Sequence, residues 1–144
     1  MIFRAIGMTY INYCSILISN CNRTSLSKLS TKYNHCGATI FNCYINSIMN
    51  YDWPDLNKIL FNQNCLYIHN IVHHNYAPNL LNIFTTADRP YNFRQQLCYI
   101  DRKSKKIGQH SFDYWAPKLW NTLPANIKSI NNINSFKLLL NNIN

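Results

Sequence analysis

Apolar residues that recur at steps of three and four narrow the choice of fold for this chain. Such spacing places side chains on one face of an α-helix, and it appears in several windows of the sequence. Only three glycines occur, and no Asn-Gly or Asp-Gly pair is present to close a β-hairpin. The sequence therefore predicts a mainly α-helical protein.

The first part, residues 1–84, is expected to be a helical region that opens with a helical hairpin. The segment Ile2–Ile18 would form the first arm, and a second helix would follow Asn22 with Thr24 as its N-cap. Apolar stripes on the two arms would pack together: Tyr10, Tyr13, Ile16 and Leu17 on the first, and Leu26, Leu29, Tyr33, Cys36 and Ile40 on the second.

A long helix is predicted to follow the hairpin. Asp52 would accept hydrogen bonds from its first free N–H groups, Pro54 would lie in its first turn, and Tyr76-Ala77-Pro78 would end it near Asn75. Its apolar face would carry Leu56, Leu60, Tyr67 and Ile71, widened by Ile59, Leu66 and Val72, and one more turn would contain Leu80, Leu81 and Ile83.

Residues 85–107 are predicted to form a basic connector with little strand, limited to Leu97, Tyr99 and Ile100. Its cationic side chains are Arg89, Arg94, Arg102, Lys103, Lys105 and Lys106, against the single Asp101 between them. Interleaved aromatics, Tyr91, Phe93 and Tyr99, would offer stacking surfaces beside the phosphate-neutralising charges. The segment is therefore the predicted nucleic-acid-binding site, and a solvated basic loop is the alternative.

Residues 108–144 are expected to be a small C-terminal helical subdomain. Ser111 would cap a short helix, and Pro117 and Pro124 would each stand where a helix begins. A compact core would contain Phe112, Trp115, Leu119, Trp120 and Leu123, with Asn121 bonded to the backbone of a turn. An amphipathic last helix would carry Ile133, Phe136, Leu139 or Leu140, and Ile143.

One string in this subdomain is specific: Ala116-Pro117-Lys118-Leu119-Trp120-Asn121-Thr122-Leu123-Pro124, after Ser111-Phe112 and before Phe136-Lys137. It resembles the C-terminal region of reverse transcriptases from LINE-type (non-LTR) retrotransposons. Shorter upstream pieces match in the family's order and extend the resemblance over essentially the whole chain: Ile11-Asn12-Tyr13-Cys14-Ser15, Asp52-Trp53-Pro54-Asp55-Leu56 and Tyr76-Ala77-Pro78-Asn79-Leu80-Leu81.

The resemblance implies a thumb-like region downstream of the catalytic palm. That palm needs paired aspartates and a third carboxylate to hold two metal ions, and no Asp-Asp pair occurs here. Where the family usually has a basic helix with Arg-Ala-Ala-Arg, residues 31–39 lack both arginines and include Gly37, which weakens a helix. We therefore expect a non-catalytic fragment, without a cofactor, that contributes non-specific nucleic-acid binding.

Three alternatives remain: a translated relic of such an element, a stand-alone small basic nucleic-acid-binding protein, and a metal-stabilised interaction module. No nucleophile elbow or phosphate-binding loop supports another enzyme. His69 and His73 lie four residues apart and share a helix face, with His74, His35, Cys36 or Cys65 as further ligands. Paired C-x-x-C units are absent, so histidines on a helix surface are the favoured interpretation.

The expected partner is anionic, because 14 Lys and Arg face only five acids and give a net charge of +9. No apolar run approaches the length of a membrane span, and the N-terminal segment is too interrupted for a signal peptide. We expect an intracellular protein, cytoplasmic or nuclear and not secreted, whose six cysteines are reduced.

Overall fold

The computed structural model describes residues 2–85, 97–100, 108 and 110–143. Helices dominate these residues and no strand occurs among them, which confirms the predicted mainly α-helical class. The chain divides into two compact units, residues 1–64 and 65–144, and the division falls inside helix α4 (Leu56–His74). None of the helices described is long and apolar enough to span a bilayer.

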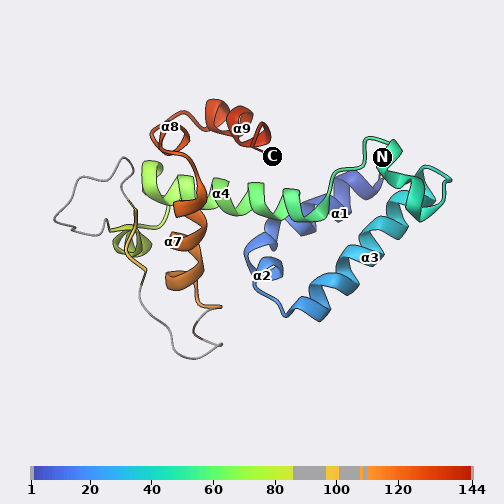
Figure 1. Cartoon of the computed structure of the whole chain (residues 1–144), viewed down its shortest axis with the longest axis horizontal. Helices are drawn as coiled ribbons and strands as arrows, with labels where there is room; N and C mark the ends of the chain where they lie inside the picture. The colour runs from blue at the N-terminus through green and yellow to red at the C-terminus, as the bar shows by residue number, and fades with distance from the viewer. Residues whose placement is uncertain (1, 86–96, 101–107, 109, 144) are drawn as a thin grey trace. The chain divides into compact units, whose positions relative to one another are not determined.

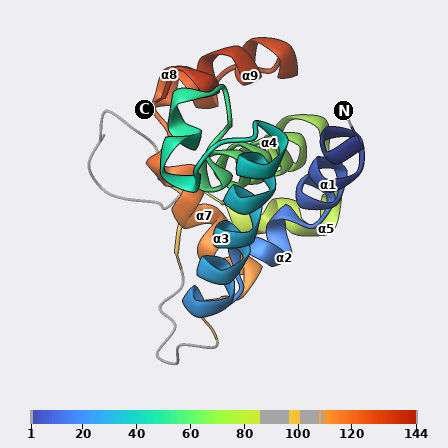
Figure 2. The same ribbon diagram turned by 90° about the vertical axis from the view of Figure 1, so that its right-hand side faces the viewer.

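The first unit opens with the predicted helical hairpin. α1 (Ile2–Tyr13) and the short α2 (Ser15–Ser19) form the first arm, and α3 (Arg23–Ile40) returns beside them (Figures 1 and 2). The hydroxyl of Tyr33 on α3 lies 4.0 Å from the Met8 sulfur on α1. The first arm is thus two helices separated at Cys14, where one continuous helix was expected.

The buried face of the first arm differs from the predicted one. Tyr10, Tyr13 and Leu17 are exposed, whereas Ile11 and Ser15 are buried. Both sides of this arm carry apolar residues at helical spacing, so the spacing alone could not select the side that packs. The side that does pack places Ile11 in a cluster with residues of α3 and of the segment before α4.

The start and the buried face of α3 also correct the prediction. Asn22, and not Thr24, is the N-cap, because its side-chain oxygen accepts a hydrogen bond from the Ser25 N–H at 2.7 Å. Cys36 and Ile40 lie outside the core, which takes Gly37 and Ala38 instead. The shift follows from the neighbour that covers this end of α3, the Trp53 ring, which approaches the helix backbone at Gly37.

A 3₁₀-helix, η1 (Ile45–Asn50), and an extended segment around Trp53 complete the core of the first unit. The rings of Tyr33 and Trp53 lie 4.8 Å apart, and the Tyr33 hydroxyl donates to the Pro54 carbonyl at 2.9 Å. Six buried side chains form this cluster: Ile11, Tyr33, Ile48, Trp53, Leu56 and Leu60. The extended segment is therefore fixed to α3 before α4 begins.

Helix α4 begins later than predicted and ends where predicted. Asp55, and not Asp52, caps it, since an Asp55 carboxylate oxygen accepts from the Lys58 N–H at 3.2 Å. At its other end Asn75 has a positive φ of 52°, and the Tyr76 N–H reaches back to the Asn70 carbonyl at 3.2 Å. The helix thus ends at a residue in the left-handed conformation, for which asparagine is one of the suitable residues.

The second unit packs the rest of α4 with short helices. These are α5 (Pro78–Leu81), the 3₁₀-helix η2 (Asn82–Phe84), α7 (Phe112–Thr122), α8 (Ala125–Lys128) and α9 (Ile133–Asn141). The extra turn predicted after α4 is thus present as α5 and η2. The buried side chains include Cys65, Ile68, Ile71, Phe84, Cys98, Ala116, Trp120, Leu123, Ile127, Phe136 and Leu140.

Two predictions for the C-terminal helices need correction. Pro117 lies inside α7 and not at its start, where its ring is buried at the cost of one backbone hydrogen bond. Ser111 does occupy the N-cap position of α7, but its hydroxyl donates to the Gly108 carbonyl and does not accept from the helix. The last helix is amphipathic as expected, with Phe136 and Leu140 buried. The structure adds its N-cap, Asn132.

Candidate nucleic-acid interface

The six predicted nucleic-acid-binding side chains lie outside the described residues: Arg89, Arg94, Arg102, Lys103, Lys105 and Lys106. The structure does describe the segment between them, residues 97–100. There the Tyr99 N–H donates to the Thr85 carbonyl at 2.9 Å, and the Cys98 thiol lies 3.7 Å from the Phe84 carbonyl oxygen. The middle of the basic connector is therefore bonded to the chain just after η2.

Asn121 holds the same segment from α7. Its side-chain oxygen accepts from the Cys98 N–H at 2.8 Å, and its amide nitrogen donates to the Cys98 carbonyl at 3.0 Å. One side chain thus satisfies both backbone groups of a single residue, as a neighbouring strand would. These two hydrogen bonds hold the backbone of Cys98. In the sequence Cys98 stands four residues after Arg94 and four before Arg102, two of the predicted nucleic-acid-binding residues.

The other residues of the string that resembles reverse transcriptases form the core of the second unit. Pro117, Trp120, Leu123 and Phe136 are buried, and the rings of Trp120 and Phe136 stack 6.2 Å apart. Phe112 is half-buried and meets Tyr67, Phe84 and Trp115 edge to face. Leu119 is half-buried, and Pro124 is exposed immediately before α8. The buried side chains support the fold, whereas Asn121 holds the backbone of Cys98.

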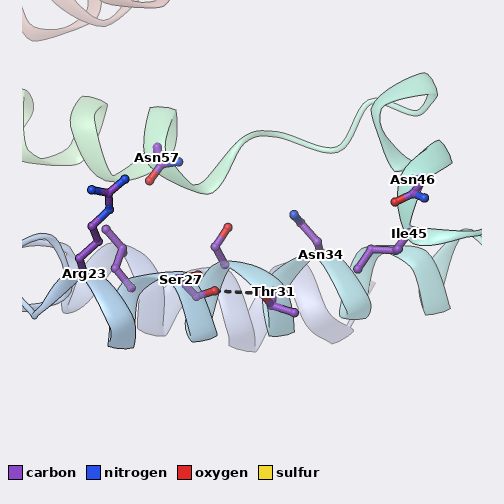
Figure 3. A pocket seen from close by; sticks show the side chains of 9 residues that line it. Arg23, Ser27, Thr31, Asn34, Ile45, Asn46 and Asn57 are labelled. Carbon is purple, nitrogen blue, oxygen red and sulfur yellow. Dashed lines mark hydrogen bonds between the residues drawn. The ribbon is translucent and has the colours of Figure 1, made fainter.

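A polar groove in the first unit was not predicted from the sequence. It has a volume of about 430 Å³ and lies between α3, η1 and the beginning of α4 (Figure 3). Its lining is Arg23, Leu26, Ser27, Ser30, Thr31 and Asn34 of α3, Ile45 and Asn46 of η1, and Asn57 of α4. Seven of these nine side chains carry a polar group, so the groove suits a ligand rich in oxygen and nitrogen.

Several polar groups in the groove are free to bind a ligand. Within the described part of the chain, the side chains of Arg23, Ser30, Asn34, Asn46 and Asn57 make no hydrogen bond or ion pair. Figure 3 shows the Arg23 guanidinium extended toward Asn57 and the Asn34 amide directed into the same space. A cation beside uncharged donors and acceptors matches a phosphate flanked by sugar hydroxyls.

A second hollow of about 420 Å³ continues along α3. It shares Ile45 with the polar groove and is also lined by His35, Ala38, Thr39, Asn42, Cys43 and Tyr44. The Tyr44 ring is 87% exposed, so one face can accept a stacked base. Together the two hollows line α3 from its first residue, Arg23, to beyond its C-terminal end.

The two histidines considered as metal ligands are bonded to the backbone. His69 is fully buried, which corrects its predicted place on the helix surface, and its Nε2 lies 2.7 Å from the Ile130 carbonyl oxygen. The Nε2 of His73 lies 2.7 Å from the Lys128 carbonyl oxygen. In the part of the chain that the structure describes, no three His, Cys, Asp or Glu side chains are grouped to hold a metal ion.

All six cysteines are free thiols, and two of them are buried. Burial raises the pKa of Cys65 to about 12 and also raises the pKa of Cys98, where the nearby Lys128 ammonium acts in the opposite direction. Both thiols therefore stay protonated at neutral pH. A protonated thiol is a poor nucleophile, so neither residue has the character of a catalytic cysteine.

The lining of the polar groove had only a partial signal in the sequence. Arg23, Ser27, Ser30 and Asn34 recur at steps of four, three and four, which marks a polar face of a helix. A solvated face gives the same pattern. Asn46 and Asn57 belong to other elements, and their place opposite that face depends on how η1 and α4 pack.

Comparisons with known proteins add no relative to these observations. Neither a family model, nor a curated protein, nor a solved structure gave a significant match to the chain.

Proposed function

We propose that this chain is a non-catalytic C-terminal fragment of a LINE-type reverse transcriptase, and that it binds single-stranded RNA or DNA without reading sequence. The observation that carries the binding proposal is the distribution of charge. Residues 89–106 hold six cationic side chains and one aspartate, which is more than half of the net charge of +9. Such a segment binds phosphates by releasing condensed counterions, whatever the base sequence.

The packing of the second unit supports the family proposal. The string from Ala116 to Pro124 supplies the buried Ala116, Pro117, Trp120 and Leu123, and it supplies the Asn121 amide that holds Cys98. The residues that carry the resemblance are therefore the ones that build this unit and position the basic connector. That division of roles gives a physical reason for such a string to persist in a binding region.

The polar groove supports binding of a single strand in the first unit. Arg23 offers a guanidinium for one phosphate, and Ser30, Asn34, Asn46 and Asn57 offer side-chain groups that make no hydrogen bond within the described residues. Hydroxyl and amide side chains contact sugars and phosphates without selecting a base. The groove would thus add affinity and orientation to the electrostatic contact, and it would add no sequence preference.

Fluorescence anisotropy with several unrelated single-stranded RNA and DNA oligonucleotides tests the binding proposal. We expect dissociation constants that agree within roughly threefold among sequences at one salt concentration, because phosphate contacts are blind to sequence. Failure to bind any of them at low salt, or a strong preference for one sequence, would contradict the proposal.

Primer extension with Mg²⁺ or Mn²⁺ should give no product. Polymerase activity that co-purifies with the chain would refute the non-catalytic assignment.

The contribution of the groove is tested by Arg23→Ala, with Lys28→Ala as the matched control. Both side chains are exposed on α3, but Lys28 does not line the groove. We expect Arg23→Ala to weaken binding several-fold more than Lys28→Ala and to lower the salt slope by roughly 0.7, because it alone removes a phosphate contact in the groove. Equal effects of the two substitutions would show that the groove is not part of the interface.

The genomic sequence upstream tests the fragment proposal against that of a stand-alone binding protein. An in-frame polymerase-coding sequence there would favour the fragment.

A further inference from the structure

Two histidines of α4 bond to the chain that joins α8 to α9. The Nε2 of His73 lies 2.7 Å from the carbonyl oxygen of Lys128, the last residue of α8, and the Nε2 of His69 lies 2.7 Å from that of Ile130. The His69 ring also lies 4.2 Å from the Phe136 ring of α9. One turn of α4 thus contacts both the linker before α9 and the buried side of α9 itself.

These bonds determine where the protons are. A carbonyl oxygen only accepts, so each Nε2 carries the hydrogen, and in a neutral ring Nδ1 then holds a lone pair. The His69 Nδ1 is buried and has no hydrogen-bond partner among the described residues. Protonation at neutral to acid pH would place a new N–H at this atom, and a buried donor without an acceptor is costly.

The surroundings of His69 also oppose a positive charge. Its neighbours on α4 are His73 and His74, whose ring centres lie 4.7 and 5.4 Å away, and Cys65 stands one turn earlier as a protonated thiol. On the linker side, Lys128 meets His73 through its carbonyl while its side chain interacts with Cys98, and α9 contributes the uncharged Phe136 ring. Burial lowers the pKa of His69, repulsion by His73 and His74 adds to this, and the bond to Ile130 acts in the opposite direction.

We propose that His69 is the pH-sensitive part of a latch that holds the α8–α9 linker and α9 against α4 at neutral pH and releases them in mild acid, with the His73 bond as the second contact of the latch. The latch consists of the two Nε2–H bonds and the contact of the His69 ring with Phe136. A charged His69 cannot keep all of these contacts inside the unit, because its new N–H needs water or an acceptor. Exposure of the ring to water requires α9 or the linker to move.

The direction of the pH effect follows from the linkage of protonation to folding. A histidine in an unfolded chain has a pKa of about 6.5, and that of His69 is lower in the folded unit. Above about pH 6.5 neither form binds the proton and the latch keeps its full strength. Below that pH the released form takes up the proton first, so each further pH unit favours release by up to about tenfold for one proton.

Nuclear magnetic resonance of the full chain with isotope-labelled histidine tests the latch. We expect the His69 ring to show the Nε2–H tautomer at neutral pH. Between about pH 7 and pH 5 we expect the resonances of Phe136 and Leu140 to change while those of Tyr33 and Trp53 in the first unit stay fixed. Phe136 and Leu140 resonances that are unchanged down to about pH 5 would refute the latch.

The variant His69→Gln separates titration from packing. Its amide can donate to Ile130 and carries no titratable group, so the acid-induced change at Phe136 should shrink or vanish. His35→Gln removes an exposed histidine of α3 and should leave the change as in the parent chain. If His69→Gln keeps the full response, another group controls it and the proposal is wrong. The tautomer and the response of the parent chain remain decisive if the variant does not fold.

Discussion

Gly37 permits a close contact between α3 and the segment that precedes α4. A Cβ built on this residue would lie 2.6 Å from the Trp53 ring and would also meet the Ile48 side chain. Glycine weakens a helix, and that was the only effect expected of it from the sequence. In the structure this loss of helix stability is offset by packing, because the absence of a side chain at Gly37 lets the Trp53 ring pack on the helix beside Tyr33.

Replacing Gly37 with alanine should therefore destabilise the first unit. Helix propensity alone would favour alanine by about 1 kcal/mol, but the overlap with Trp53 should reverse the sign and give a net loss of about 1–3 kcal/mol. Urea denaturation followed by circular dichroism measures the change. Cys36→Ala, at the exposed neighbouring position, should stay within about 0.5 kcal/mol of the parent. A variant at Gly37 that is as stable as the parent would contradict the close packing of Trp53 on α3.

The N-cap of α3 offers a second comparison between neighbouring side chains. Asn22→Ala should lower the free energy of unfolding by about 1 kcal/mol, because the Ser25 N–H loses its acceptor. Thr24→Ala should change it by less than about 0.5 kcal/mol, since Thr24 lies exposed inside the first turn. The reverse order in a thermal melt would restore Thr24 as the cap.

Helices were easier to predict than their faces. The spacing of apolar residues and the turn residues located α3 and α4 to within a few positions, because both helices are long and only one of their ends is ambiguous. The predicted buried side of α1 and α2 was wrong, because apolar residues occupy both sides of these helices. Pro117 inside α7 was also unforeseen, since the rule that places proline at helix starts is overridden when its ring is needed in a core.

The contact between α7 and the basic connector depends on Asn121. Asn121→Ala should destabilise the second unit by about 1–3 kcal/mol, because both backbone groups of Cys98 lose their partner. It should also weaken nucleic-acid binding although no charge is removed. Asn126→Ala, at an exposed position of α8, is the matched control and should affect neither property. Undiminished affinity of Asn121→Ala, measured where the variant is fully folded, would show that the connector needs no anchor.

Taken as a whole, the chain is cationic in both of its units. Residues 1–64 carry a net charge of +3 and residues 65–144 a net charge of +6. This excess, and its concentration in residues 89–106, could be predicted from the sequence. The polar groove could not, because its lining joins residues from α3, η1 and α4 whose proximity arises only from packing around Trp53.

The salt dependence of binding is the sharpest test of whether residues 89–106 are the nucleic-acid site. The logarithm of the association constant for a single strand should fall linearly with the logarithm of salt concentration, by roughly 0.7 per phosphate contact. The quadruple variant Arg102→Ala, Lys103→Ala, Lys105→Ala, Lys106→Ala should bind all sequences more weakly, with a slope smaller by roughly 0.7 for each lost contact. A control with Lys28, Lys32, Lys118 and Lys137 replaced by alanine removes the same charge elsewhere and should keep most of the slope. If the first variant keeps the affinity and the slope of the parent chain, residues 89–106 are not the nucleic-acid site and the claim fails.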